Sequence, residues 1–139
     1  MTAFDIISAV RKHIELLWLE QVRVGCGYGP DGERTMDLWG ISPKRPFLHV
    51  AVEIKTSRGD FLRDVKQPMK QRRARLAANQ FYFAAPAGML TAADLPLWAG
   101  LIEVHPSGLA RIAVPAPWFD SSPPTWSFVA SLVRRLSRE

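Results

Sequence analysis

The chain has 139 residues and a hydrophobic content of 47%, which suits one compact domain with a sizeable core and is too short for two ordinary domains. Its one cysteine, Cys26, cannot close a disulfide within the chain, and with three scattered histidines it does not predict a zinc site. We find no signal peptide and no apolar run near the roughly 20 residues that span a bilayer, so we expect a soluble, cytoplasmic protein without membrane contact. The net charge of +5 favours a polyanionic partner.

The first predicted helix covers residues 3–21, where six apolar side chains recur at helical spacing: Phe4, Ile7, Val10, Ile14, Leu17 and Trp18. Thr2 or Asp5 is suited to cap its start. A hairpin follows, with strands at residues 22–28 and 34–40 joined by a Gly-Pro-Asp-Gly turn at residues 29–32.

Residues 47–55 have the clearest strand pattern in the sequence. Because side chains alternate between the two faces of a strand, one face is wholly apolar, with Leu48, Val50, Val52 and Ile54. The other face carries His49, Ala51, Glu53 and Lys55. Glu53 and Lys55 are therefore expected to project together.

The second predicted helix covers residues 60–78, and Ser57 or Asp60 can cap its start. Its expected apolar face consists of Leu62, Val65, Met69 and Leu76. Pro68 lies inside this stretch, so we expect a kink or two consecutive short helices.

The rest of the chain predicts a strand at residues 80–85, a short helix near 92–98, strands at 100–105 and 109–114, a proline-rich arm at 115–124 and a helix at 125–138. The order of elements predicts an α/β or α+β sandwich, with a mixed central sheet flanked by helices. We expect one domain at residues 1–114, with residues 115–139 packed on it as an arm and a C-terminal helix.

A carboxylate and an ammonium on one strand face are groups that hydrolysis of a phosphodiester can use. Glu53 would hold a hard cation such as Mg²⁺ or Mn²⁺, and Lys55 would orient or help deprotonate the attacking water. Asp37 is the natural second metal ligand, because same-face residues of neighbouring antiparallel strands lie a few ångströms apart. Taken alone, a Glu-x-Lys pair on a strand is more commonly a solvated ion pair.

The segment after this strand is rich in positive charge. Between positions 58 and 75 there are two acidic residues, Asp60 and Asp64, and seven basic residues: Arg58, Arg63, Lys66, Lys70, Arg72, Arg73 and Arg75. Beside a metal site, a helix with this excess can contact a phosphate backbone, although alone it would equally suit a solvated surface. The sequence leaves open whether Asp64 pairs with Arg63 or Lys66 or supports Lys55.

Asp37 followed by Glu53-x-Lys55, in this order of elements, resembles the PD-(D/E)xK nuclease superfamily. The segment from Val52 to Pro86 is more narrowly similar to the MmcB-like family of proposed DNA-repair endonucleases, through residues 52–57, Asp60-Phe61, Asp64, Lys66 and residues 81–86. The likeness covers roughly residues 3–105. Met36 precedes Asp37 where the superfamily name has proline. The resemblance implies a restriction-endonuclease-like αβββαβ core, in which the acidic pair binds the metal and the lysine serves the water.

The resemblance implies two further roles. A glutamate on the first helix often faces the site in this superfamily, and Glu15 is the first choice with Glu20 in reserve. A polar residue on the helix after the Glu-x-Lys strand commonly touches phosphate, and Gln71 fits, with Lys66 and Gln67 as competitors. The remaining nucleic-acid contacts would come from Lys66, Lys70, Arg72, Arg73 and Arg58.

The sequence therefore predicts a nucleoid-associated, Mg²⁺- or Mn²⁺-dependent nuclease that acts on DNA. We expect little base specificity, because nothing visible reads base edges. The alternative is a catalytically inactive module of the same fold that binds nucleic acid or a repair partner. Small nucleases often dimerise to cut two strands, so a homodimer is compatible with the sequence.

Overall fold

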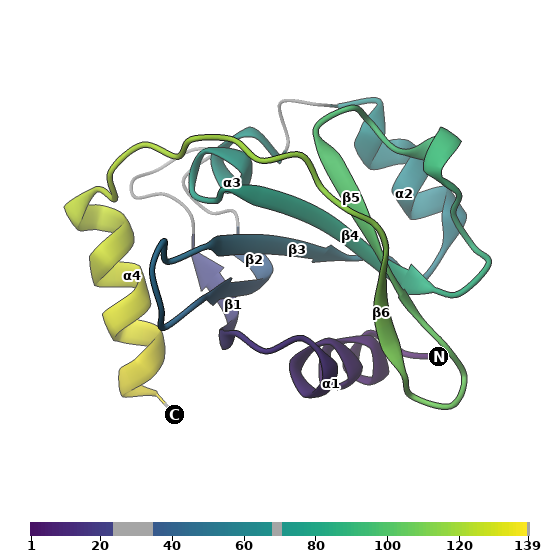
Figure 1. Cartoon of the computed structure of the whole chain (residues 1–139), viewed down its shortest axis with the longest axis horizontal. Helices are drawn as coiled ribbons and strands as arrows, with labels where there is room; N and C mark the ends of the chain where they lie inside the picture. The colour runs from purple at the N-terminus through teal and green to yellow at the C-terminus, as the bar shows by residue number, and fades with distance from the viewer. Residues whose placement is uncertain (24–34, 68–70, 139) are drawn as a thin grey trace.

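A six-stranded mixed sheet with the order β1-β2-β3-β4-β5-β6 organises the described part of the chain (Figure 1). The computed structural model describes residues 1–23, 35–67 and 71–138. The strands are β1 (Leu17–Arg23), β2 (Thr35–Ile41), β3 (His49–Ile54), β4 (Gln80–Pro86), β5 (Ala99–Val104) and β6 (Ala110–Val114). The β3–β4 and β4–β5 pairs are parallel, and the other three pairs are antiparallel. This arrangement confirms the predicted mixed sheet.

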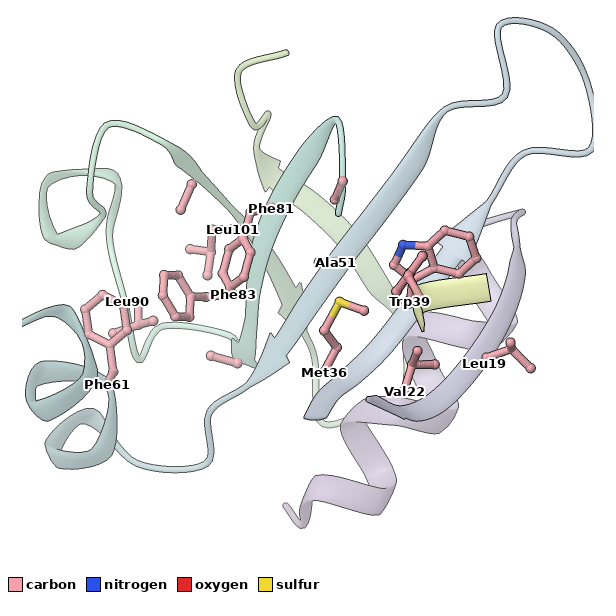
Figure 2. Packing of buried hydrophobic residues seen from close by; sticks show 14 residues of the cluster. Leu19, Val22, Met36, Trp39, Ala51, Phe61, Phe81, Phe83, Leu90 and Leu101 are labelled. Atoms are coloured by element: carbon pink, nitrogen blue, oxygen red, sulfur yellow. The ribbon is translucent and has the colours of Figure 1, made fainter. Parts of the chain in front are cut away.

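Helices cover both faces of the sheet. On one face lies α1 (Ala3–His13), whose Ile6 and Val10 pack with side chains of β2, β3, β4 and β5. The other face is covered by α2 (Arg58–Val65), α3 (Arg72–Leu76) and α4 (Trp126–Ser137). Figure 2 shows part of the core on this second face, where Phe61 packs edge-on against Phe83. The central strands are therefore buried on both faces.

The first helix is shorter than predicted. A capping box between Thr2 and Asp5 starts α1 as expected, but the helix ends at His13 and β1 begins at Leu17. Trp18 packs in the core cluster on the α1 face, and Leu19 packs in the cluster on the other face. A strand between two covered faces buries both side chains, whereas a helix would turn most of this apolar run to one side.

The second predicted helix is two short helices, α2 and α3, as Pro68 led us to expect. Ser57 caps α2, accepting a hydrogen bond from the Asp60 N–H. The expected apolar face is partly wrong, because Leu62 and Leu76 are exposed and Phe61 is fully buried instead. Met69 lies outside the described residues.

The predicted elements after α3, and the strand predicted at residues 34–40, are present with bounds shifted by a few residues, and the short helix is a 3-10 turn, η2 (Ala92–Asp94). Of the strand predicted at residues 22–28, only residues 22 and 23 are described, at the end of β1. Residues 24–34, including the predicted Gly-Pro-Asp-Gly turn, lie outside the described part. The arm at residues 115–124 folds back on the sheet, where the Ala116 N–H donates to the Tyr82 hydroxyl at 3.1 Å. Within the described ranges, no helix is long and apolar enough to cross a membrane.

Candidate functional site

Asp37 lies where the pairing of β2 and β3 ends. The last paired residues are Leu38 and Val52. Beyond them the Asp37 side chain replaces the main-chain acceptor, because its Oδ2 accepts a hydrogen bond from the Ile54 N–H at 2.8 Å. Asp37 Oδ1 lies 3.5 Å from Nε2 of Gln21, a residue of β1 in the left-handed region with φ 53°. Asp37 is thus held between β1 and β3.

Burial raises the pKa of Asp37 above its ordinary value of 3.8. The hydrogen bonds from Ile54 and Gln21 and the charge of Lys55 act in the opposite direction, while the charge of Asp64 raises the pKa further. A cation bound beside this carboxylate would favour its charged form.

Lys55 is buried between two carboxylates at the end of β3. Its Nζ donates to Oδ2 of Asp64 and lies 3.7 Å from Oε1 of Glu53. The side chains of Lys55 and Asp64 are 8% and 6% exposed, and that of Glu53 is 26% exposed. Glu53 and Lys55 therefore project to one face, as strand alternation predicts, with Glu53 nearer to solvent.

Asp64 pairs with Lys55, which is one of the alternatives that the sequence left open. Arg63, one of the two basic residues considered as a partner for Asp64, pairs with Asp60 on the exposed side of α2. The sequence did not predict this role, because Phe61, whose burial marks the inner face of α2 three residues before Asp64, was not among the expected apolar residues. A charged residue at such a position needs a buried partner.

A polar pocket of about 350 Å³ opens beside Lys55, between the end of β3 and α2. It is lined by Ile54, Lys55, Thr56, Asp60, Arg63, Asp64 and Gln67. The Arg63 side chain is mostly exposed, so it can turn toward a ligand in the pocket at little cost. The two cations that line the pocket, Lys55 and Arg63, are each paired with a carboxylate of α2.

The prediction that a glutamate of the first helix faces the site is wrong for both candidates, Glu15 and Glu20. Glu15 is exposed and follows α1, next to the end of β1 where Leu17 pairs with Ile41, and Ile41 with His49. Asp37 and Glu53 lie toward the opposite end of these strands. Glu20 lies on β1 and pairs with Arg11 of α1, on the face of the sheet away from α2. Both outcomes follow from the early end of α1.

The predicted nucleic-acid ligands differ in how they are placed. Lys66 and Arg72 are exposed. The Arg58 guanidinium makes two hydrogen bonds of 2.9 and 2.8 Å to the Asp94 carboxylate. Gln71 is buried, and its Oε1 accepts no hydrogen bond from a described residue. Lys70 and the side chain of Arg73 lie outside the described residues.

Among the residues that the structure describes, no group of three or more His, Cys, Asp or Glu side chains is placed to hold a metal ion. The predicted metal ligands number two, Asp37 and Glu53.

Comparisons with known proteins address the fold. The sequence matches no family model and no curated protein. The structure is similar to that of a protein of unknown function from Silicibacter pomeroyi, with a TM-score of 0.71 and 20% sequence identity over 99% of this chain and 86% of that one. This likeness shows a shared fold only.

Proposed function

We propose that the protein is a metal-dependent nuclease that hydrolyses phosphodiester bonds in DNA, with a restriction-endonuclease-like core formed by α1, β1, β2, β3, α2 and β4. The observation that carries the proposal is the buried Lys55 ammonium, held between Glu53 and Asp64 beside the desolvated Asp37. An isolated surface ion pair would not be buried in this way. The arrangement supports the roles that the resemblance implies for Asp37, Glu53 and Lys55.

The donor set fits Mg²⁺ or Mn²⁺. Magnesium is commonly held by one or two carboxylates, with water and substrate phosphate completing its coordination, so Asp37 and Glu53 would suffice. When bound, the cation would polarise the phosphate and lower the pKa of a bound water. Lys55 has three N–H donors and two carboxylate neighbours, which leaves capacity for a water or a phosphate oxygen in the pocket. There it would position the water and stabilise developing negative charge.

A catalytically inactive module that binds nucleic acid or a repair partner is the second candidate. It is favoured by the absence, among the described residues, of a group of three or more side chains suited to a metal, and by the pairing of Lys55 with Asp64, which would need no metal to be stable. In that case the basic residues of the α2–α3 segment would carry the function.

Cleavage of a panel of labelled DNA structures in Mg²⁺, Mn²⁺ and EDTA separates the two candidates. A nuclease cleaves with metal, stops in EDTA, and loses activity in Glu53→Gln while still binding DNA. An inactive module binds every substrate without cleavage, and its binding is the same with and without EDTA.

A further inference from the structure

A second pocket lies on the same face of the sheet as Lys55, away from the proposed cleavage site. Its volume is about 320 Å³, at the lower end of the roughly 300–1,000 Å³ typical of small-ligand sites. It lies between α3, the start of β4 and the arm, and its lining includes Arg72, Arg75, Phe81, Trp98 and Phe119. Figure 1 shows the arm passing α3 on its way to α4.

The walls of this pocket are aromatic. Phe81 packs edge-on against Trp98, and the Arg75 guanidinium lies over the Trp98 ring at 4.3 Å from its centre. Phe119 also lines the pocket and is half exposed. Nucleobases stack on aromatic rings and on guanidinium planes that are themselves held by aromatic side chains.

The charges of the pocket favour an anion. Two arginines, Arg72 and Arg75, line the pocket together with one acidic residue, Asp120, whose carboxylate accepts a hydrogen bond from Trp118 at 3.3 Å. The pKa of Arg75 is lowered, first by burial and then by repulsion from Arg72. A phosphate between the two guanidiniums would relieve this repulsion.

We propose that this pocket takes the base of one unpaired DNA nucleotide, with the nucleotide's phosphate at Arg72 and Arg75. The inference rests on the proposed function for its choice of DNA, and it adds a substrate class: strands with an unpaired or extruded base. Lys55 lies beside Ala84 of β4, and Phe81 comes three residues earlier, about 10 Å away at 3.3 Å per residue. That spacing is about three nucleotides of a stacked strand, so one strand can reach both sites.

Fluorescence anisotropy in EDTA tests the inference without cleavage. The probes are a labelled duplex with one unpaired adenine, the same duplex with an abasic residue in its place, and the fully paired duplex. We expect the wild type to bind the unpaired adenine about tenfold more tightly than either control. Phe119→Ala should lose most of this preference, and Arg72→Ala should weaken binding of the unpaired-adenine duplex.

Two features of the arm make the test sharp. Phe119 is anchored through its main chain, since its N–H donates to Asn79 O and its carbonyl accepts from Asn79 Nδ2, so removing the ring leaves the anchor in place. Trp118 is as exposed as Phe119, at 49%, but does not line the pocket. Trp118→Ala is therefore the matched control and should keep the preference.

Equal binding of the unpaired-adenine and abasic duplexes would overturn the inference, as would equal losses in Phe119→Ala and Trp118→Ala. Competition by free deoxyadenosine monophosphate as strong as by the unpaired-adenine duplex would also overturn it, because the pocket would then serve a free nucleotide. Since the assay contains no metal, a failure here leaves the cleavage site standing, and a failure of cleavage leaves this result standing.

Discussion

At the scale of single residues, the pair formed by Lys55 and Asp64 is the part of the site with the largest energetic consequence. Both side chains are almost fully buried, and two ions removed from water are stable only while they remain paired. Removing one partner leaves the other as an uncompensated buried charge.

Asp64→Ala should therefore destabilise the protein by about 3 kcal/mol, measured by urea denaturation. Asp60→Ala is the matched control, because its pair with Arg63 is exposed, and it should cost no more than about 1 kcal/mol. The double variant Lys55→Met with Asp64→Leu should recover much of the loss. Equal small effects of Asp64→Ala and Asp60→Ala would show that the pair is not desolvated in solution.

The raised pKa of Asp37 predicts an unusual dependence of the free energy of unfolding on pH. Because its pKa is raised in the folded state, the folded chain holds this proton to a higher pH than the unfolded chain, and stability falls as pH rises above 3.8 through the raised pKa. Asp37→Asn keeps an oxygen for the Ile54 N–H but removes the charge. In EDTA the variant should be more stable than the wild type at neutral pH, and the difference should shrink on acidification.

Saturating Mg²⁺ should make the wild type the more stable of the two, because only the wild type would bind the ion at Asp37. At a Mg²⁺ concentration a hundredfold above the Kd, the stabilisation is about 2.7 kcal/mol. Thermal denaturation with and without Mg²⁺ measures both effects. A variant that is less stable than the wild type in EDTA would show that the hydrogen bonds of Asp37 outweigh its desolvation.

At the scale of elements, the sequence predicts best where one pattern admits one structure. Alternation on β3 predicts that Glu53 and Lys55 lie together, and a proline at position 68 of the sequence predicts two helices, α2 and α3, in place of one. The boundary between α1 and β1 could not be predicted, because Leu16 to Leu19 is apolar throughout and fits a helix or a strand buried on both faces. The aromatic pocket could not be predicted from the sequence, because it depends on a contact between Asn79 and Phe119, which are 40 residues apart in the chain.

Where β5 meets the start of the arm, the backbones approach closely at Gly100. A Cβ there would lie 2.5 Å from Val114 O and 2.6 Å from Ala116 N, which are main-chain atoms that cannot easily move. Gly100→Ala should destabilise the protein by about 1–3 kcal/mol in thermal denaturation. Gly59→Ala in α2, where a Cβ meets nothing within 4 Å, should instead stabilise it by about 0.5–1 kcal/mol. A neutral Gly100→Ala would mean that the arm does not dock here.

At the scale of the whole molecule, the net charge of +5 predicts that binding of DNA weakens steeply with salt, because phosphate contacts release counterions. Arg72→Ala should lower the slope of log K against log salt by about one unit, the value for one phosphate contact. Arg134→Ala, which removes the same charge from α4, should leave the slope unchanged. Equal changes in both variants would indicate diffuse attraction without a defined contact at Arg72.

The most direct test of a nuclease centred on Lys55 is its single-turnover rate of DNA cleavage in Mn²⁺, compared between the wild type and Lys55→Ala. We expect metal-dependent cleavage by the wild type and a loss of at least about a hundredfold in the variant, as for removal of a transition-state donor. Lys44→Ala, an exposed lysine in the β2–β3 connection, controls for the lost charge, and the double variant Lys55→Met with Asp64→Leu controls for the unpaired Asp64 charge that Lys55→Ala leaves buried. Cleavage by Lys55→Ala at the wild-type rate, or no cleavage by the wild type despite salt-sensitive binding, would contradict the proposed function.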